Sequence, residues 1–339
     1  MGKDEFLILY PVCKTVRGAR RGMICDLQNL SYHLVPNSLI DIIDQLSITP
    51  VDQLYQETEG EEKPILAEYI NFIISKRLGF VTASPELFPP LSDMFEYPSL
   101  VSNAIISIDE HSAHNYKLIF SELSELNCKG LELRFLNTPG NEELFNLLTL
   151  IQNTRIQSID LIIKHTEFLT PDFFSKLTGQ FRRLNYIQVH SAPMNEEIEI
   201  KDNYSFLRYT SKCILDHSFC GRINEKNFSP NMMLFTESIH FNNCLNKKIS
   251  IDERGKIKNC PSMTNDFGQH GNVSLIKVIN DKNFSALWGI TKDQVEICQV
   301  CEFRYICIDC RAYRSTESIT SKPLKCAYNP YLAQWETLN

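Results

Sequence analysis

The residues of this sequence whose chemistry is easiest to interpret are its cysteines. Nine of the twelve lie from residue 213 onward. They are Cys213, Cys220, Cys244, Cys260, Cys298, Cys301, Cys307, Cys310 and Cys326. The segment 298–310 has the spacing C-x2-C-x5-C-x2-C, and thiolates so close in sequence converge on one centre only if the chain wraps around it. Sulfur ligands select zinc or iron–sulfur clusters, so the pattern predicts a metal centre.

Two kinds of centre fit these thiolates. Zinc sites made from two cysteine pairs usually separate the pairs by roughly 15 to 20 residues, whereas five residues separate Cys301 from Cys307. A single zinc ion would also leave half of the clustered cysteines unexplained. Because each four-iron cluster takes about four thiolates, we expect two [4Fe-4S] clusters. A zinc site, a single cluster and no metal are the alternatives.

The remaining composition is that of an acidic, folded protein. The chain has 339 residues, 43% of them hydrophobic, and a formal net charge of −7. These values predict two or three domains and argue against nucleic-acid binding. No apolar run is long enough to span a membrane. Phe6–Tyr10 follows two acidic residues and lacks the cleavage site of an export signal, so we expect a cytoplasmic protein, in which grouped cysteines bind metal more often than they form disulfides.

Signatures of other chemistry are missing. The sequence contains no GxxxxGK[ST], GxGxxG, HExxH or GxSxG motif. His111 and His114 follow a predicted strand, where imidazoles more often cap a helix or face solvent than bind metal. Cys13, Cys25 and Cys128 lie in apolar surroundings and are expected to be small buried hydrophobes.

The first 85 residues or so combine strand and helix patterns. Two strand-like stretches, 6–16 and 23–35, are joined by a turn between Gly18 and Gly22. Two helical segments follow: SLIDIIDQL (38–46), capped by Pro36-Asn37-Ser38, and ILAEYINFIISKRL (65–78), which begins after Pro64 and stops at Gly79. A further strand starts at Phe80. This order predicts a winged-helix module, and the proline-rich segment 85–98 is its linker to the rest of the chain.

Between residues 104 and 191, strands alternate with helices. The predicted strands are AIISID (104–109), LELRFL (131–136), SIDLIIKH (158–165) and LNYIQVHS (184–191). Helical spacing is found in NYKLIFSELSEL (115–126), EELFNLLTLIQ (142–152) and DFFSKLTGQF (172–181). The alternation predicts a parallel sheet with crossover helices. With one or two more strands near Tyr209–Leu215 and Met233–Phe241, we expect an open, partial (β/α) barrel.

Regular periodicity fades after about Cys213. KKISIDERGKIKNC (247–260) predicts a hairpin whose turn is Asp252–Gly255. In EICQVCEFRYICIDCRAY (296–313), cysteines occupy positions where a core would have apolar residues. Something other than side-chain packing must hold this region together.

The cysteine pattern resembles the SPASM domain of radical S-adenosylmethionine peptide maturases. The resemblance is carried by Cys244, Gly255, Cys260, Cys298, Cys301, Cys307, Cys310 and Cys326. The chain departs from the family where only Ile308 and Asp309 separate the third and fourth cysteines of the compact group, since the family has three residues there. The resemblance implies auxiliary iron–sulfur clusters in a loop-rich C-terminal domain.

Carried over by position, the family pattern implies two ligand sets. One cluster would take Cys244, Cys260 and Cys310. The other would take Cys298, Cys301, Cys307 and Cys326. The first set lacks a fourth ligand, for which Cys220 is the expected residue, with Cys213 and an open iron site as alternatives.

A radical enzyme of this family also needs cysteines spaced C-x3-C-x2-C after the first barrel strand. The sequence contains no such triplet, and EHSAHNYK (110–117) follows that strand instead. We therefore expect a barrel that keeps the architecture of the family and lacks its radical cluster.

Four longer motifs narrow the resemblance to the SPASM proteins of grasp-with-SPASM systems, and it extends over the whole chain. The motifs are VRGARRGMICDLQ (16–28), KKISIDERGKIKNCPSM (247–263), DFGQHGN (266–272) and CEFRYICIDCRAYR (301–314). Such systems combine an ATP-grasp ligase with a small precursor peptide. The resemblance implies a role in maturing a ribosomally made, graspetide-type peptide, with both of these molecules as partners.

The N-terminal module resembles the precursor-recognition element of such proteins. Its exposed strand edge would accept a leader peptide as an added strand. Lys14, Arg17, Arg20 and Arg21 would suit an acidic leader, and a merely solvated basic turn is the alternative. A winged helix also binds DNA in some proteins, but the acidic net charge and the lack of a basic recognition helix argue against it here.

The predicted protein is thus α/β with three parts. They are a winged-helix-like peptide-recognition module (1–90), a partial (β/α) barrel (100–240) and a SPASM iron–sulfur domain (241–339) to which Cys220 contributes. We expect an adaptor that binds the precursor peptide and presents it to the ATP-grasp ligase. One alternative is a redox or cluster-based peptide-modifying enzyme with an open iron site, and another is a zinc scaffold.

Overall fold

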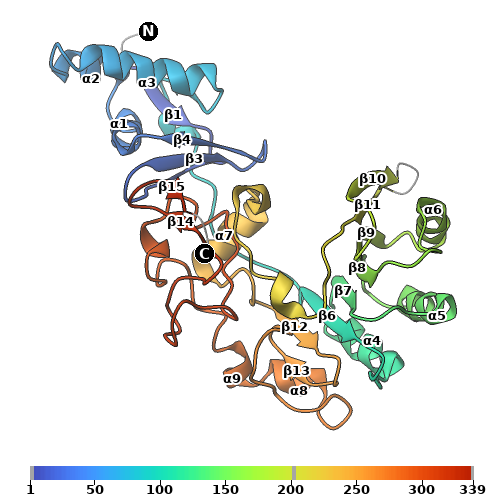
Figure 1. Ribbon diagram of the computed structural model, residues 1–339. Coiled ribbons are helices and arrows are strands. Elements are labelled where there is room, and N and C mark those ends of the chain that lie inside the picture. Colours follow the sequence, from blue (N-terminus) through green and yellow to red (C-terminus); the bar gives the residue numbers. More distant parts are fainter. Residues whose placement is uncertain (1–3, 201–203, 337–339) are drawn as a thin grey trace. The chain divides into compact units, whose positions relative to one another are not determined.

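The chain forms two compact units, whose elements are labelled in Figure 1. The computed structural model describes residues 4–200 and 204–336. Unit 1 is drawn from Met1–Phe95, Gly221–Asn243 and Ile290–Asn339, and unit 2 from Glu96–Cys220 and Cys244–Gly289. Each unit therefore combines segments that are far apart in the sequence. The predicted division into three consecutive modules (1–90, 100–240 and 241–339) stays a prediction.

Unit 1 begins with five short strands in two sheets. Their bounds are β1 Phe6–Leu9, β2 Cys13–Val16, β3 Gly22–Asp26, β4 Ser31–Val35 and β5 Gly79–Thr82. The strands β2, β3 and β4 form an antiparallel sheet with β3 in the middle, while β1 pairs antiparallel with β5. All of β3 is buried. The predicted strand-rich start is confirmed, although each predicted stretch is divided into two strands.

Three helices follow this sheet. They are α1 Asn37–Leu46, α2 Val51–Glu57 and α3 Lys63–Ser75. Apolar residues three or four apart give α1 one buried face, made of Leu39, Ile40, Ile43 and Leu46. Pro64 lies in the first turn of α3, where a missing N–H removes no helical hydrogen bond. The helices α1 and α3 confirm the predictions, whereas the short α2 was missed.

The predicted cap of α1 is wrong. Pro36 occupies the N-cap position and no side chain caps the helix. Instead, Asn37 donates from Nδ2 to the Gly18 carbonyl at 2.9 Å. The Ser38 hydroxyl shares a hydrogen bond with the Tyr69 hydroxyl of α3 at 2.7 Å. These two polar side chains join α1 to the β2–β3 turn and to α3.

A strand predicted at 233–241 is also wrong, because Met232–His240 is helix α7 of unit 1. The Asn231 side chain accepts a hydrogen bond from the Leu234 N–H at 2.9 Å and starts the helix. The Thr236 hydroxyl donates to the Met232 carbonyl one turn earlier. A short apolar run fits either kind of element, and here the polar cap decides.

The last segment of unit 1 has little regular structure, as expected. From Ile290 to Glu336 the elements are a 3-10 turn η4 (Cys298–Val300) and two short strands, β14 (Tyr328–Asn329) and β15 (Gln334–Trp335). An apolar cluster joins this segment to β2, β3 and α7. Its buried members are Val16, Met23, Cys25, Leu27, Ile223, Phe235, Phe303, Ile306, Cys307 and Tyr328.

Unit 2 is built on an eight-stranded, mostly parallel sheet with the order β10-β11-β9-β8-β7-β6-β12-β13. The bounds are β6 Asn103–Ile108, β7 Gly130–Phe135, β8 Ser158–Lys164, β9 Leu184–His190, β10 Glu196–Ile200, β11 Ser205–Tyr209, β12 Lys248–Ile251 and β13 Ile257–Lys258. Only the pairs at the two ends, β10–β11 and β12–β13, are antiparallel. The predicted open parallel sheet is confirmed. Its relation to the partial barrel of radical enzymes stays a prediction.

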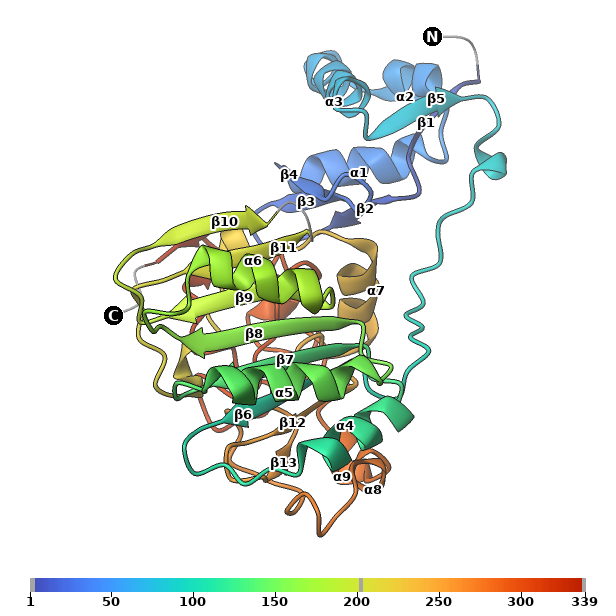
Figure 2. The ribbon, with the colours of Figure 1, turned by 90° about the vertical axis from the view of Figure 1, so that its right-hand side faces the viewer.

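Three helices cover one face of this sheet, as Figure 2 shows. They are α4 Tyr116–Glu125, α5 Asn141–Gln152 and α6 Pro171–Gln180. Their apolar faces and the inward side chains of the strands form one large core, with Phe120, Phe135 and Phe174 fully buried. Asn115 and Thr170 cap α4 and α6 with their side-chain oxygens. The four predicted strands and three predicted helices between 103 and 190 are confirmed.

One strand prediction near the sheet edges needs correction, and another is confirmed. The strand expected near Tyr209–Leu215 ends at Tyr209, since β11 occupies the residues before it. The predicted hairpin at 247–260 is confirmed, with the Gly255 N–H donating to the Asp252 carbonyl at 2.8 Å across the turn. What the sequence did not reveal is that β12 also pairs in parallel with β6. The hairpin is therefore part of the unit 2 sheet.

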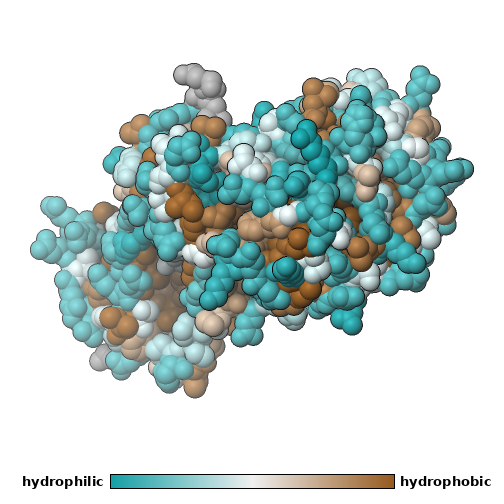
Figure 3. Space-filling view, turned by 90° about the horizontal axis from the view of Figure 1, so that it is seen from below, coloured by the Kyte–Doolittle hydropathy of each residue, from teal (hydrophilic) through white to brown (hydrophobic). Residues whose placement is uncertain are grey.

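Two short helices, α8 (Leu275–Ile279) and α9 (Lys282–Ser285), complete unit 2. Among the described residues, no helix has both the length and the apolar composition needed to cross a bilayer. On the face shown in Figure 3, hydrophilic residues predominate and hydrophobic residues lie in groups between them. Exposed apolar side chains of this kind are ordinary on a folded protein.

Candidate metal centres

Four of the predicted ligands lie close together in unit 1. The thiols of Cys298 and Cys307 interact electrostatically with each other and with those of Cys301 and Cys326, which places the four in one neighbourhood. Cys298 and Cys307 are only 7% and 6% exposed. Burial raises the pKa of the Cys298 thiol to about 12 and the pKa of Cys301 well above its ordinary value. Such thiols are inert as nucleophiles and need a metal or a nearby cation to become thiolates.

Local hydrogen bonds and the apolar cluster hold this loop. Cys298 starts η4, and its carbonyl accepts the N–H of Cys301 at 2.9 Å. Phe303 and Ile306, between the second and third cysteines, are anchored in the core of unit 1. Cys326 comes from further along the chain, where its segment forms a bridge with Ile223. The chain thus wraps around the four thiols, as their spacing required.

Lys292 lies beside these thiols and is 3% exposed. Its Nζ donates to the carbonyls of Cys307 and Ile308, both at 3.0 Å. Burial acts to lower the pKa of Lys292, but the thiols of Cys307 and Cys298 outweigh burial, so that the pKa is raised. Lys292 is therefore a buried amine beside two thiols, and those thiols favour its cationic form only when they are ionised.

A polar network supports the turn that contains Ile308 and Asp309. The Asp309 carboxylate binds the guanidinium of Arg311 at 2.6 Å and accepts from Asn242 at 2.8 Å. Asn243 donates to the Cys307 carbonyl at 2.9 Å and accepts from the Asp309 N–H at 2.9 Å. Arg311 is fully buried. Asn242 and Asn243, which follow α7 in the sequence, therefore fix the segment from Cys307 to Asp309 with their side chains.

A second group of thiols lies in unit 2 around Arg134. Arg134 belongs to β7 and is 2% exposed. Its Nε donates to Glu132 at 2.7 Å, and a guanidinium nitrogen lies 3.0 Å from Nδ1 of His217. The guanidinium also stacks 4.7 Å from the ring centroid of Phe219. Both Cys220 and Cys260 interact electrostatically with this cation.

Cys220 is the better placed of the two candidates for the fourth ligand of this group. Burial raises the pKa of its thiol to about 11, Arg134 opposes that rise, and Cys260 adds to it. Cys220 therefore lies near Cys260. Cys213, by contrast, is exposed. The structure favours Cys220, although ligation itself stays a prediction.

Cys310, which the family resemblance assigns to the same set, belongs to unit 1 and is 5% exposed. Gly221, the residue bonded to Cys220, lies against it. A side chain at Gly221 would place its Cβ 2.8 Å from the Cys310 sulfur, and Gly221 has φ +77°. Only glycine fits this close approach and this conformation without strain. Cys244 is half-buried in unit 2, and its place in the set stays a prediction.

No disulfide joins any of the twelve cysteines, all of which the structure describes. Over residues 4–200 and 204–336, no three His, Cys, Asp or Glu side chains stand arranged around a single metal ion. Ligands of a four-iron cluster bind different irons, so they lie further apart than the ligands of one ion. The donor set of unit 1 suits such a cluster in its chemistry: four cysteine sulfurs lie in one region, and the ammonium group of Lys292 lies beside Cys298 and Cys307.

The remaining cysteines match their expected role. Cys13, Cys25 and Cys128 are buried in apolar cores, and burial raises the pKa of each thiol to about 12. Of the two histidines, His111 is exposed, as expected. His114 is not, since it is half-buried with Nε2 2.9 Å from the Ser107 carbonyl. Burial lowers the pKa of His114, which favours the neutral ring.

The basic turn is partly neutralised by the protein itself. Arg17 pairs with Asp41 of α1 and lies 3.6 Å from Asp44. Arg21 pairs with the buried Glu302 at 2.8 Å. Arg20 is exposed. A peptide-binding role for these arginines stays a prediction, and Arg20 is the one most accessible to a ligand.

The N-terminal sheet has an accessible edge of the kind that binds peptides. The strand β4 is an edge of its sheet, and His33 of β4 packs edge-on against Phe72 of α3 at 5.8 Å between ring centroids. Leu34 of β4 is 37% exposed. Strand β4 therefore lies beside α3 on the His33 face, and Leu34, on the opposite face of the strand, is partly exposed.

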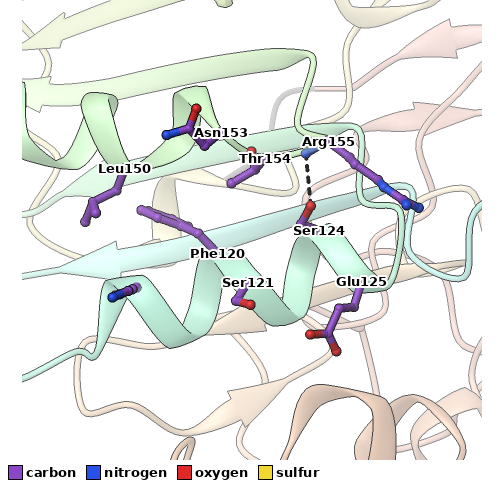
Figure 4. A pocket seen from close by; sticks show the side chains of 9 residues that line it. Phe120, Ser121, Ser124, Glu125, Leu150, Asn153, Thr154 and Arg155 are labelled. Carbon is purple, nitrogen blue, oxygen red and sulfur yellow. Dashed lines mark hydrogen bonds between the residues drawn. The ribbon is translucent and has the colours of Figure 1, made fainter.

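A cavity of about 300 Å³ lies between α4 and the end of α5 in unit 2 (Figure 4). It is lined by Lys117, Phe120, Ser121, Ser124, Glu125, Leu150, Asn153, Thr154 and Arg155. The Arg155 N–H donates to the Ser124 hydroxyl at 3.1 Å across it. Its lining contains no cysteine or histidine, so this cavity is separate from the thiol groups.

Sequence reasoning did not find Lys292, Arg134 or His217. The position of Arg134 was a usable signal. It lies inside a strand two residues after Glu132, so the two side chains lie on the same strand face and can form an ion pair. Lys292 had none, since a lysine in a loop is usually solvated.

Comparisons with known proteins give little further information. No protein-family model matches the chain, and no curated protein matches it. Structures of SuiB from Streptococcus suis are weakly similar. The one bound to S-adenosylmethionine has a TM-score of 0.39 and 11% identity over 97% of this chain and 100% of that chain. The one bound to precursor peptide SuiA has a TM-score of 0.39 and 10% identity over 94% and 99%. Similarity at this level does not establish a shared fold or function.

Proposed function

We propose that this chain is an iron–sulfur protein of ribosomal-peptide maturation, which binds a precursor peptide and presents it to a partner ATP-grasp ligase. The observation that carries the metal part is the grouping of the Cys298, Cys301, Cys307 and Cys326 thiols in one region, with the buried Lys292 beside two of them, Cys298 and Cys307. The peptide part rests on the accessible strand β4 beside α3 and on the family resemblance of the sequence motifs.

In this proposal the unit 1 thiols hold one [4Fe-4S] cluster. The second takes Cys220, Cys244 and Cys260 with Cys310. The buried cation Arg134 supports this second set, because it lies next to both Cys220 and Cys260. Clusters bound in this way would fix the loop-rich segments and could carry single electrons.

The leader of the precursor would add to β4 as a further strand. Main-chain hydrogen bonds to the strand edge would supply affinity, and the side chains of the neighbouring helix α3 would select the side chains of the leader. Arg20 would attract acidic residues of the leader, since Arg17 and Arg21 already have carboxylate partners in this chain.

Iron counting on the full chain tests the metal part. After purification without oxygen we expect about eight irons and eight sulfides per chain, the content of two cubane clusters. Zinc in place of iron would support the scaffold alternative and overturn this proposal. Iron near four per chain would leave one ligand set empty and restrict the proposal to the unit 1 site.

Peptide binding is tested with a synthetic acidic leader peptide. We expect Arg20→Glu to weaken binding of an acidic leader by about tenfold, or about 1.4 kcal/mol. The matched control is Lys176→Glu, which makes the same kind of charge change at an exposed basic residue of α6, in the unit that does not contain β4. Equal weakening by both variants would show that only net charge matters.

The redox alternative predicts chemistry at the unit 2 set. If Cys220→Ala abolished peptide maturation while eight irons remained, an open iron site would be doing chemistry there. In the adaptor proposal the same variant, with its iron intact, should still support maturation by the ligase.

A further inference from the structure

Lys292 is a buried charge without a carboxylate of its own. It is 3% exposed, and its ammonium group donates to two backbone carbonyls, those of Cys307 and Ile308. Asp309 is the nearby carboxylate, but it binds Arg311 at 2.6 Å and accepts from Asn242. The carbonyls orient the ammonium group but carry no negative charge to balance it.

A buried ammonium group of this kind is costly. Moving an ion from water into a protein interior costs several kcal/mol even after relaxation, and carbonyl dipoles recover only part of it. The sequence therefore gains from Lys292 only if an anion lies within a few ångströms. Besides Asp309, whose charge Arg311 already balances, the groups beside the ammonium are the thiols of Cys307 and Cys298, and Nζ lies 3.0 Å from the Cys307 carbonyl. As thiolate ligands they would supply the missing negative charge.

The same lysine also fixes the backbone of a ligand. Its two hydrogen bonds bracket the peptide between Cys307 and Ile308. Lys292 thus combines a fixed positive charge with control over the position of Cys307. Charge and hydrogen bonding near the sulfurs are the factors by which a protein tunes a cluster's reduction potential.

We propose that Lys292 is a positioning residue whose buried charge sets the reduction potential of the unit 1 cluster, an inference that rests on the proposed cluster ligands Cys298, Cys301, Cys307 and Cys326. Reduction adds one electron, and hence one negative charge, to the site without forming or breaking a bond. A cation held a few ångströms away stabilises the reduced form more than the oxidised form. Removing the charge of Lys292 therefore lowers the potential.

The test is a redox titration of the full chain with dithionite as the one-electron donor. Lys292→Gln removes the charge and keeps a hydrogen-bond donor for the carbonyls. We expect its midpoint potential to fall by at least about 59 mV. For one electron, this shift lowers the ratio of reduced to oxidised cluster about tenfold at a fixed potential. Lys292→Arg keeps the charge and should stay close to the wild type.

Lys322→Met is the matched control. Lys322 also lies in unit 1 and donates to a backbone carbonyl, that of Tyr328, at 2.7 Å. Lys292, and not Lys322, is the cation that acts most strongly on the Cys298 and Cys307 thiols. The midpoint potential of Lys322→Met should equal that of the wild type. Cys307→Ser, which should remove the unit 1 cluster, identifies the titration step that belongs to this site.

Each outcome decides the matter. Suppose that the wild type holds about eight irons and that the midpoint potential of Lys292→Gln equals that of Lys322→Met. This result overturns the inference about Lys292 and leaves the proposed function intact. A wild type without iron overturns both. If Lys292→Gln takes up no unit 1 iron on reconstitution, retention by Lys292→Arg supports the role of the charge, and loss by both variants overturns it.

Discussion

The two cysteine groups of this protein are supported in different ways. In unit 1, Cys298, Cys301 and Cys307 lie in a segment whose only regular elements are one 3-10 turn and two strands of two residues. In unit 2, Cys260 lies two residues after the end of β13, and the cation beside Cys220 lies inside β7 of the eight-stranded sheet. Both groups have one buried cation, Lys292 in the first and Arg134 in the second.

The comparison suggests what each region gains from metal. The sheet of unit 2 has a large apolar core of its own, so its cysteines lie on a framework that folds without ligands. The Ile290–Glu336 segment has a smaller apolar cluster, and polar networks and thiols hold the rest. Metal binding should therefore contribute mainly to function or fine structure in unit 2, and to folding itself in unit 1.

The largest expected effect comes from deleting one ligand in each region. Both Cys307→Ser and Cys260→Ser should lower the iron content from about eight to about four per chain. Only Cys307→Ser should loosen residues 290–336, with faster amide exchange by on the order of tenfold or more. Hydrogen exchange read by mass spectrometry distinguishes the segments. Similar loosening of β6–β9 by Cys260→Ser would contradict the proposed difference.

A smaller effect is expected from the cation of unit 2. Arg134→Met leaves Glu132 without its partner. We expect the free energy of unfolding to fall by about 2–3 kcal/mol. This value is somewhat below that for a fully buried pair because the Glu132 side chain is 24% exposed. Chemical denaturation of the metal-free protein measures it. Arg208→Met is the control, since its pair with Glu197 is exposed and 3.5 Å long, and should cost less than about 1 kcal/mol. Equal losses would mean that Arg134 matters only through metal.

Asp160 gives a further, pH-dependent effect in the same region. It faces Glu132 across β7 and β8, and burial, with a smaller contribution from Glu132, raises its pKa from 3.8 to about 6. The folded state thus binds the proton more tightly than the unfolded state, so this group's contribution to stability is full below about pH 4 and is lost as pH rises through 6. Asp160→Asn should therefore stabilise the protein at pH 7 by roughly 1–2 kcal/mol.

Unfolding curves at pH 4, 6 and 8 check this expectation. The difference between Asp160→Asn and the wild type should grow with pH over this range. A difference that is constant with pH would show that the carboxylate is solvated. Iron content should not change, because Asp160 belongs to neither proposed ligand set.

Much of the fold was predictable because its signals are local. The alternation of strands and helices from 103 to 190 follows from periodicity, as does the hairpin at Asp252–Gly255. The pairing of β12 with β6 was not predictable, because partners 145 residues apart leave no periodic signal. Helix α7 was misread since nine mostly apolar residues fit a strand equally well, and only the Asn231 cap reveals the helix.

The candidate sites divide in the same way. Spacing alone grouped Cys298, Cys301 and Cys307, because ligands so close in sequence must also be close in space. Long-range groups such as Lys292 and Arg134 became visible only with burial, since nothing in the sequence shows that these two cations are enclosed while Arg20 is exposed.

The smallest expected effect is the most specific for the unit 2 ligand set. Cys213 is exposed and Cys220 lies beside Cys260 and Arg134, although only six residues separate the two cysteines. Cys213→Ser should leave iron content unchanged and alter the free energy of unfolding by less than about 0.5 kcal/mol, the usual range for a surface substitution. Cys220→Ser should lose unit 2 iron or make it labile to chelators. The reverse result would transfer the fourth ligand to Cys213 and require the segment after β11 to turn inward when iron binds.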